Sequence, residues 1–503
     1  MTGDIFCISI NNRLGVKNFK KTEIMSKLME ALQTENTTTK NGMTTNSSSL
    51  NECVNLFFSI GAMRGKSVDS IITLFSKAFN ENPRTAMRIL FWARDIRGGA
   101  GERQIFRDIM SYLVNNHVEA VRVNLDLIPE YGRWDDVHGL FGSELEGDAI
   151  TLLVDGLKSE NGLCAKWMPR KGVVFNKVRK SFKVDPKTLR KIIVSLSNTV
   201  EQKMCSKNWE EIEYPKTPSL AMSRYTKTFS KNDKERFGEY IESLKKGETK
   251  VNAGALYPYD VTKNLRFGGD KDLANEQWKA LPNYMEGSEE LILPIVDVSG
   301  SMGVPVGDNP NLTCMEVAIS LGMYISERNE GEFKDMFMTF SSRPEIQKLL
   351  GPLSDRYNQL ARAEWGMTTD LEASFRTLLD QAIKFNIPQG EMPTKVLILS
   401  DMQFNQATGG GYRRNDSNWN PTVMGMIDEM YNQAGYTRPG IIFWNLNAHG
   451  GNFPAKFDEN GTALVSGFSP SIMKPILNNP NSLTPVNIMN ETVNSERYEP
   501  ITV

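Results

Sequence analysis

The residues best suited to chemistry alternate in the sequence DVSGSM, where Asp297, Ser299 and Ser301 offer one carboxylate and two hydroxyl groups. Hard divalent cations such as Mg²⁺ prefer oxygen ligands of this kind. Two further segments carry similar groups, because Thr368 lies in GMTTD and Asp401 directly follows KVLILS. The residue types and their spacing therefore favour a divalent-cation site.

These groups follow segments that have the pattern of buried strands. In open α/β sheets, ligands bind at the carboxyl ends of the strands, near the point where the strand order reverses. Continuous apolar runs that alternate with helical patterns predict a parallel sheet covered on both faces. The expected strands are LILPIV (291–296), DMFMTF (335–340), KVLILS (395–400), GIIFWN and the weaker TALVS (462–466).

The residues alone leave alternatives to a cation site open. DVSGSM could be a strand-to-helix turn with a capping serine, and a degenerate site could bind no metal. A zinc site or a disulfide scaffold is disfavoured, because the chain has three histidines and five scattered cysteines without a CxxC pair. The few histidines also make acid–base catalysis an unfavourable hypothesis.

In their order and strand context, the three segments resemble the metal-ion-dependent adhesion site of von Willebrand factor A domains. The resemblance implies an ion, Mg²⁺ or Mn²⁺, with one position open for a carboxylate from a protein partner. Thr369 could exchange roles with Thr368. The resemblance implies that Ser299, Ser301 and Thr368 supply hydroxyl ligands, while Asp297 and Asp401 bind the ion directly or through water.

The first half of the chain has a different organisation. Its apolar spacing predicts a succession of helices and short turns to about residue 245, as in HEAT-like helical-repeat proteins. A helix is expected to begin at an N-cap, Ser67, and another after Pro83. We therefore expect a multidomain protein with an all-α HEAT-like part before an α/β von Willebrand factor A-like part. The expected domains are a short helix near 20–34 with a flexible linker (together 1–49), the helical domain (50–285), the α/β domain (286–480) and a C-terminal tail (481–503).

Long segments of the chain resemble a poorly characterised family of plant, fungal and viral proteins that joins a helical region to a von Willebrand factor A-like region. The same two-part plan is similar to that of TROVE proteins, the Ro autoantigen type, in which a ring of helical repeats binds RNA. The segments that carry the family resemblance are RILFWARDIRGGAGERQIFR, IPEYGRWDDV, TPSLAMSRYTKTF, KNDKERF, NAGALYPYDV, WGMTTDLEASF, LILSDMQF, PGIIFWNLN and ALVSGFS.

Basic residues are concentrated in positions 161–200, where Asp185 is the one acidic residue. Aromatic residues interleave with the cations, a pattern that suits contacts with phosphates and stacking on bases. A solvated helix face with buried aromatics is the alternative. The residues predicted to bind nucleic acid are Lys166, Arg170, Lys171, Lys177, Arg179, Lys180 and Lys183.

Arg94 and Arg97 form a second predicted nucleic-acid patch beside the glycine turn GGAG (98–101). Backbone N–H groups in such a turn, next to a helix N-terminus, could approach an anion. The alternative is a set of arginines that bridge to nearby acidic residues. The turn lacks the Lys and Ser/Thr of a P-loop, so nucleotide hydrolysis is not predicted.

The net charge of −2 hides a basic first part and an acidic second part, which suggests a polyanionic partner for the first. With the Ro-like plan, this favours a non-catalytic RNA-binding ribonucleoprotein component whose metal site binds a protein. The alternative is a protein-interaction scaffold or viral assembly component without nucleic acid. A catalytic phosphodiesterase is disfavoured by the hydroxyl-rich ligand set. Without a membrane-length apolar run or a secretory signal, a cytoplasmic or otherwise intracellular protein with no membrane partner is expected.

Overall fold

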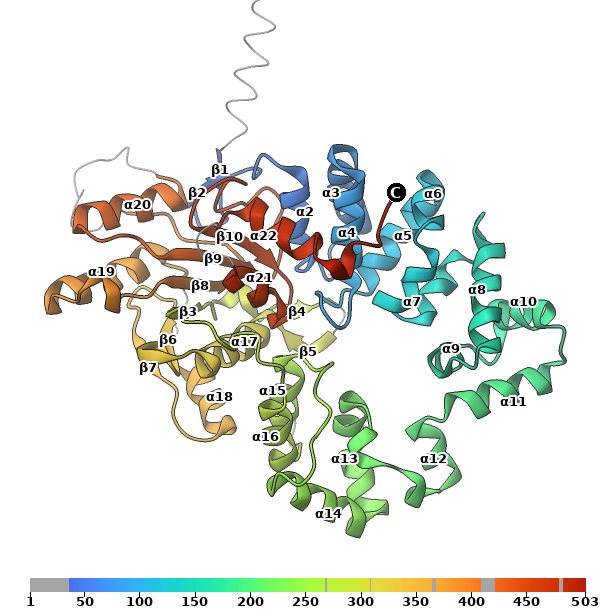
Figure 1. Ribbon diagram of the computed structural model, residues 1–503. Helices are drawn as coiled ribbons and strands as arrows, with labels where there is room; N and C mark the ends of the chain where they lie inside the picture. The colour runs from blue at the N-terminus through green and yellow to red at the C-terminus, as the bar shows by residue number, and fades with distance from the viewer. Residues whose placement is uncertain (1–35, 267–268, 308, 364–367, 409–420, 479–482) are drawn as a thin grey trace, which may run out of the picture.

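The protein combines a helical part with an α/β part in one continuous structure (Figure 1). The short helix expected near 20–34 lies outside the described residues, as do Gly366 and Met367. The computed structural model describes residues 36–266, 269–307, 309–363, 368–408, 421–478 and 483–503.

Residues 52–279 are mainly helical, as predicted. Short 3-10 turns lie between some of the helices, at Leu125–Leu127, Trp134–Leu140, Trp209–Glu211 and Tyr214–Lys216. The α-helices are α2 (Glu52–Ile60), α3 (Val68–Glu81), α4 (Pro83–Arg94), α5 (Gln104–Asn116), α6 (Val118–Arg122), α7 (Ile128–Tyr131), α8 (Glu146–Lys158), α9 (Gly162–Trp167), α10 (Gly172–Phe182), α11 (Pro186–Ser197), α12 (Val200–Ser206), α13 (Ser219–Asn232), α14 (Lys234–Lys245), α15 (Pro258–Arg266) and α16 (Lys271–Lys279).

Local sequence signals set several of these boundaries. The Ser67 side chain accepts a hydrogen bond from the Ser70 N–H at 3.3 Å and so caps α3. Pro83 occupies the first turn of α4, where a missing N–H costs nothing. Both helix starts were predicted, because N-cap and proline preferences depend on the local backbone alone.

The helices follow one another around an arc. Figure 1 shows the arc leaving the α/β part at α2, passing through α8 to α14 and returning at α15 and α16. Helices pack in neighbouring pairs such as α3 with α4 and α13 with α14, and α15 contacts α17 (Cys314–Arg328) of the α/β part. Among the described residues, no helix has the length and apolar composition needed to cross a bilayer.

The α/β part contains a sheet whose described strands lie in the order β10-β9-β8-β3-β6-β7. All neighbouring pairs are parallel except that of β6 with β7. Every predicted strand is confirmed, whereas β7 was not predicted because its sequence IQK carries no apolar run. The strands are β3 (Ile292–Val296), β6 (Met336–Thr339), β7 (Ile346–Lys348), β8 (Lys395–Ser400), β9 (Gly440–Asn445) and β10 (Thr462–Ser466).

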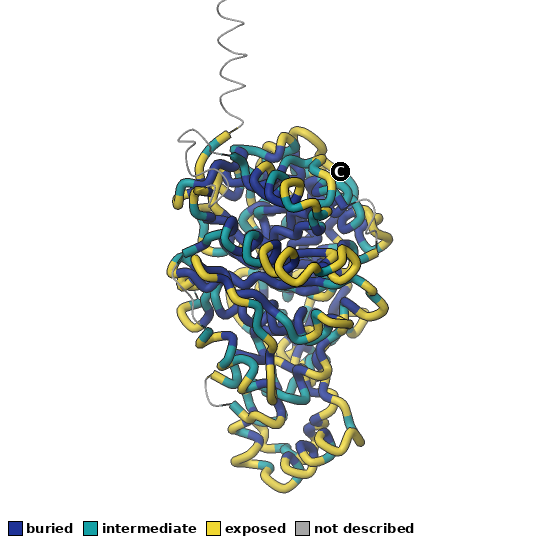
Figure 2. Tube along the Cα trace, turned by 90° about the vertical axis from the view of Figure 1, so that its left-hand side faces the viewer, coloured by how far each residue is buried: buried dark blue, intermediate teal, exposed yellow. Residues whose placement is uncertain are grey.

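Helices from both parts of the chain cover this sheet. α17 packs against β3, β6 and β8, while α2 of the helical part packs against β9 and β10. One hydrophobic core therefore runs through both parts, and a smaller core lies around α13 and α14. Figure 2 shows buried residues concentrated in the body with the sheet and mainly exposed residues at the lower end. The remaining elements are β4 (Pro305–Val306), β5 (Asn309–Thr313), α18 (Leu353–Arg362), α19 (Leu371–Phe385), α20 (Val423–Ala434), α21 (Met473–Asn478) and α22 (Pro485–Val493).

The prediction of a flexible linker at 35–49 is wrong for its described residues. Residues 36–46 form a hairpin of β1 (Asn36–Thr38) and β2 (Thr44–Asn46). Asn46 and Phe453 exchange two backbone hydrogen bonds of 3.0 and 2.9 Å, and the Asn41 amide donates to the Gln403 carbonyl at 2.7 Å. Small polar side chains fix this segment by bonding to loop backbone, so no apolar periodicity marks it in the sequence.

The C-terminal segment is also part of the packed structure rather than a tail. α22 contacts β10, α2 and α4. Tyr498 is 2% exposed, and its hydroxyl donates to Asp95 of the helical part at 2.9 Å. The buried Asp95 carboxylate also accepts a hydrogen bond of 2.8 Å from Arg497. The chain end therefore joins the helical part to the sheet.

Candidate metal centre

The candidate metal centre lies where β3 and β8 end side by side. Asp297 directly follows β3, and its N–H donates to the Leu399 carbonyl at 2.9 Å. Asp401 directly follows β8. The chain places β6 and β7 on one side of β3 and β8 to β10 on the other. The two carboxylates thus stand at the switch point where ligands bind in open α/β sheets.

Asp297 is fully buried and held by two hydrogen bonds. Its Oδ2 accepts from the Ser400 hydroxyl at 2.6 Å, and its Oδ1 accepts from the Ser299 N–H at 2.9 Å. Burial and the negative charge of Asp401 raise the pKa of Asp297 to about 6. A cation bound beside Asp297 would stabilise the charged form of this buried carboxylate.

The two serines of DVSGSM face each other. Their Oγ atoms, on Ser299 and Ser301, lie 3.0 Å apart at the start of a short 3-10 turn (Gly300–Gly303). Ser299 is buried, and its backbone is tied to Asp297. The alternation in the sequence therefore places the two hydroxyls next to each other, with that of Ser299 beside the first carboxylate.

The loop that contains Thr368 and Thr369, here called the threonine loop, reaches the same edge. The hydroxyl groups of the two threonines differ in their contacts. Thr369 donates to the Gln403 carbonyl at 2.6 Å, and its own carbonyl accepts from the Asn405 N–H at 2.9 Å. These contacts place the loop beside the segment that begins at Asp401. The Oγ1 of Thr368, by contrast, is buried without a hydrogen-bond partner among the described residues. Thr368 is therefore the better candidate of the two for an ion.

A second buried oxygen at this edge also lacks a hydrogen-bond partner. Asp401 is 1% exposed, and its Oδ1 accepts from the Gln403 N–H at 3.2 Å, but its Oδ2 has no hydrogen-bond partner in the described chain. Native proteins rarely leave such atoms unsatisfied. The donor set therefore fits a hard divalent cation, with Asp297, Ser299, Ser301, Thr368 and Asp401 as the residues that would hold it.

His449 and Asn452 also lie near this edge, although the sequence pattern does not mark them as site residues. Both lie in the loop after β9, which is the strand next to β8. His449 Nε2 lies 3.5 Å from Asp401 Oδ2, and the Asn452 amide donates to the Met402 carbonyl at 2.7 Å. The available signal was the position of His449 shortly after an apolar strand, whose carboxyl end lies at the same edge as Asp401.

The predicted basic cluster of 161–200 divides into two groups. Lys177 pairs with Glu146 at 2.5 Å, and the guanidinium groups of Arg170 and Arg179 donate to backbone carbonyls near the ends of α9 and α10. These three side chains thus have structural contacts. The exposed members of the cluster are Lys166, Lys171, Lys180 and Lys183.

The structure contradicts the prediction for Arg94. This side chain is buried, and its guanidinium pairs with Asp136 at 2.6 Å. Arg97 is exposed, although its Nη1 donates to the Glu130 carbonyl at 2.7 Å. The alternative hypothesis, in which these arginines pair with nearby acidic residues, is therefore correct for Arg94.

The glycine turn is explained by close packing rather than by an anion. A Cβ at Gly99 would lie 1.9 Å from the Trp92 carbonyl oxygen, so no larger residue fits. The Ala100 and Glu102 N–H groups donate to carbonyls of α4 at 3.1 and 2.6 Å. These two amides are therefore unavailable to a phosphate.

A groove of about 940 Å³ lies between the start of α5 and the β4–β5 hairpin. Its lining includes Lys66 and Arg103, which interact with the charges of Asp401 and Asp135 but form no direct ion pair with another described residue. Burial and the positive charges of Arg133 and Arg107 lower the pKa of Arg103. The cations available beside the glycine turn are thus Lys66 and Arg103 rather than Arg94.

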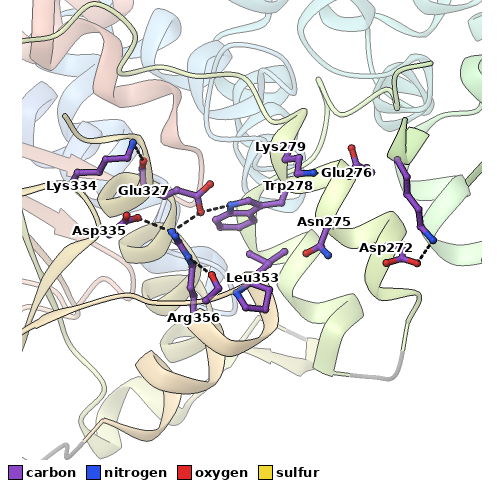
Figure 3. Close-up of a pocket in the computed structure, with 13 residues that line it drawn as sticks. Asp272, Asn275, Glu276, Trp278, Lys279, Glu327, Lys334, Asp335, Leu353 and Arg356 are labelled. Carbon is purple, nitrogen blue, oxygen red and sulfur yellow. Dashed lines mark hydrogen bonds and ion pairs between the residues drawn. The ribbon is translucent and has the colours of Figure 1, made fainter. Parts of the chain in front are cut away.

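A second cavity, of about 550 Å³, separates α16 from α17 and α18 (Figure 3). Its charged groups satisfy one another, since Arg356 pairs with Asp335 at 2.6 Å and Lys245 with Asp272 at 2.7 Å. The Trp278 indole N–H donates to Glu327 at 2.9 Å. This cavity is best described as a polar contact between the helical and α/β parts.

Comparison with known proteins gives two matches to domain families. The chain is similar to families of unknown function. A domain of unknown function (DUF2828) matches residues 39–132 and 173–291, and a second (DUF7788) matches residues 292–500. The boundary between the two matches coincides with the start of β3 at Ile292.

A relative of similar length contains both parts. It is an uncharacterized protein of Acanthamoeba polyphaga mimivirus, 28% identical over 530 residues, which cover 90% of this chain and 89% of the relative. The matches together support a family of unknown function that joins the helical part to the α/β part.

Proposed function

We propose that the protein is a non-catalytic binding protein whose α/β part uses one Mg²⁺ or Mn²⁺ ion to bind a carboxylate of a protein partner. The observation that carries this proposal is the pair of buried oxygens, Thr368 Oγ1 and Asp401 Oδ2, which have no hydrogen-bond partner in the described chain. A buried polar atom left unsatisfied costs about 1–3 kcal/mol. A bound cation would remove this cost at both atoms.

The sheet topology supports the assignment of this part as von Willebrand factor A-like. Among the described strands of the sheet, five run parallel and one is an antiparallel edge strand, and this order brings Asp297 and Asp401 to the switch point between β3 and β8. In the adhesion sites that this centre resembles, the ion keeps a position open for a partner. A carboxylate from a second protein would complete the coordination here in the same way.

A hydrolytic role fits the side chains less well. Two-metal hydrolases gather several carboxylates around their ions. Among the described residues, no group of three or more His, Cys, Asp or Glu side chains is arranged to hold a metal. The centre instead offers Asp297 and Asp401 with three hydroxyl groups, a set that suits binding.

Titration of Mn²⁺ and Mg²⁺ into the purified full chain by calorimetry tests the proposal. We expect saturable binding with one ion per chain. Addition of a chelator should then release any protein partner captured with the metal-loaded chain. Failure of both ions to bind would contradict the proposed function.

We also propose that the helical part binds RNA, so that the protein is a ribonucleoprotein component similar in plan to TROVE proteins. Two observations favour this role: the exposed lysines of α9 and α10, and the groove with Lys66 and Arg103. Cations that form no direct ion pair with another described residue are available to phosphates, and such contacts release counterions. The rival is a protein-interaction scaffold, in which the same cations meet water or an acidic protein.

Replacing Lys171, Lys180 and Lys183 together by Ala should weaken binding to mixed single-stranded RNA. The slope of log affinity against log salt should flatten by roughly one unit for each phosphate that the variant no longer neutralises. The measurement is fluorescence anisotropy over a range of salt concentrations. Lys227→Ala with Lys231→Ala is the control, because both lysines are exposed on the distant helix α13. Equal RNA affinity in all proteins, or no binding at low salt, would favour the scaffold.

A further inference from the structure

The groove between the start of α5 and the β4–β5 hairpin borders the candidate metal centre. The hairpin follows shortly after Ser301 in the chain. Lys66 also lines the groove, and the negative charge of Asp401 acts on its ammonium group. The Ala62 carbonyl, which lies just before this lysine in the chain, accepts from the Ala448 N–H of the loop after β9 at 2.9 Å. A ligand held at the metal edge could therefore continue into the groove.

The charged side chains of the groove leave a surplus of positive charge. The acidic residues of the described lining are Glu102 and Asp108, and the basic ones are Arg64, Lys66, Arg94, Arg103 and Arg133. Glu102 pairs with Arg64 at 2.7 Å, while Arg94 and Arg133 pair with acids outside the lining. Arg103 is exposed, and the positive charges of Arg133 and Arg107 act on it. A negative group bound beside Arg103 and Lys66 would offset this surplus.

The uncharged part of the lining is mainly aliphatic. None of the described residues that line the groove is aromatic. Single-stranded RNA without a specific sequence is commonly bound by stacking its bases on aromatic side chains. A groove with cations and aliphatic side chains instead suits a peptide that has acidic and aliphatic residues. The apolar lining residues are Met63, Val68, Ile71, Ile96, Ile105 and Val306.

We propose that this groove binds an acidic, aliphatic segment of the protein partner whose carboxylate the metal centre takes, with Lys66 and Arg103 pairing to further carboxylates of that segment. The inference rests on the proposed metal centre and adds the chemistry of its partner. The volume of about 940 Å³ lies within the range of about 300–1,000 Å³ that is usual for ligand sites. The RNA proposal then depends on the exposed lysines of α9 and α10.

Two labelled peptides test the inference with the Mn²⁺-loaded full chain. The first is acetyl-Asp-Leu-Ile-Glu-Val-Glu with a fluorescent label at its C-terminus, and in the second both glutamates are replaced by glutamine. Both offer an aspartate to the metal, so the difference between their affinities reports on the groove. We expect the first peptide to bind about tenfold more tightly, because its additional carboxylates meet Lys66 and Arg103. Fluorescence anisotropy measures both affinities.

The variant Arg103→Ala should reduce this difference to about threefold or less and leave the affinity of the second peptide unchanged. Arg224→Ala is the matched control, because it removes an exposed arginine from the distant helix α13 and should preserve the full difference. Equal affinities of the two peptides for the parent protein would overturn the inference and leave the metal centre intact. A difference that Arg103→Ala does not reduce would overturn it in the same way.

Two further measurements separate the groove from the metal and from RNA. If a chelator changes the affinity of neither peptide but the difference persists and depends on Arg103, the groove assignment stands and the proposed function of the metal centre fails. Equal peptide affinities together with mixed single-stranded RNA binding that Arg103→Ala weakens would assign the groove to RNA and overturn the inference. Absence of binding by both peptides would also overturn it, while calorimetry with Mn²⁺ decides the metal centre independently.

Discussion

Asp297→Asn should abolish binding of Mg²⁺ and Mn²⁺ while the fold persists. The substitution removes the carboxylate that follows β3 and leaves its neighbours in place. We expect the affinity for either ion to fall by at least about 100-fold, since loss of a ligand exceeds the effect of losing an outer-shell partner. Calorimetry measures the affinity, and circular dichroism measures the helix and strand content.

The fold should tolerate this change for an electrostatic reason. Burial and the charge of Asp401 raise the pKa of Asp297 to about 6, so its carboxylate is unfavourable in the metal-free protein at neutral pH. Asparagine is neutral, its Oδ1 can still accept from the Ser299 N–H, and its Nδ2 can donate to the Ser400 hydroxyl oxygen, which in the parent protein donates to Oδ2. The metal-free variant should therefore unfold no more easily than the metal-free parent protein.

Asp370→Asn is the matched control for loss of negative charge. Asp370 follows the threonine loop, but its Oδ1 caps α19 by accepting from the Ala373 N–H at 2.8 Å. Asparagine caps helices equally well. Metal affinity should change by less than about threefold, because an outer carboxylate contributes less than a ligand. Equal losses of metal affinity in the Asp297 and Asp370 variants would mean that the overall negative charge of this edge, and not ligation by Asp297, holds the ion.

Asp136→Ala should strongly destabilise the helical part. The Asp136 carboxylate is buried, pairs with the buried Arg94 at 2.6 Å and accepts from Arg107 at 2.7 Å. Removal of one partner from a buried ion pair costs about 3–5 kcal/mol, because the other charge remains buried without compensation. In urea unfolding followed by circular dichroism, the helical signal should be lost at a lower urea concentration in the variant than in the parent protein.

Asp135→Ala provides the comparison at the adjacent position. The Asp135 side chain is 19% exposed and pairs with the partly exposed Arg133 and Arg107. Ion pairs of this kind near the surface contribute about 0–1 kcal/mol to the free energy of unfolding. If Asp135→Ala lowered the free energy of unfolding as much as Asp136→Ala, the conclusion that the Arg94–Asp136 pair stabilises the helical part most strongly would be contradicted.

Local sequence patterns were enough to predict the elements that carry the candidate centre. Apolar runs marked β3 and β8, and each of these strands ends directly before an acidic residue. Because parallel strands align their carboxyl ends, the proximity of Asp297 and Asp401 follows from the strand order alone. The serines of DVSGSM are close to Asp297 in the sequence, so their place was also predictable.

The cationic surfaces were predictable in composition but not in exposure. A run of lysines and arginines in the sequence does not reveal which of them meet acids or carbonyls elsewhere. Glu146 lies far from Lys177 in the sequence but pairs with it across α8 and α10. Likewise Arg94 became a buried partner of Asp136, because helix packing and not local sequence decides which cations are covered.

The sequence by itself determined the two-part organisation, the strands and the short motif around Asp297, since these depend on interactions between near neighbours in the chain. Only the tertiary structure decided what joins them. It attached the β1–β2 hairpin to the loops after β8 and β9, placed Tyr498 against Asp95 and brought His449 to Asp401. Each contact links residues distant in the sequence through a few hydrogen bonds or a single pair of polar atoms. Such contacts leave no periodic pattern, because a single polar partner can be supplied by almost any segment that the fold brings near.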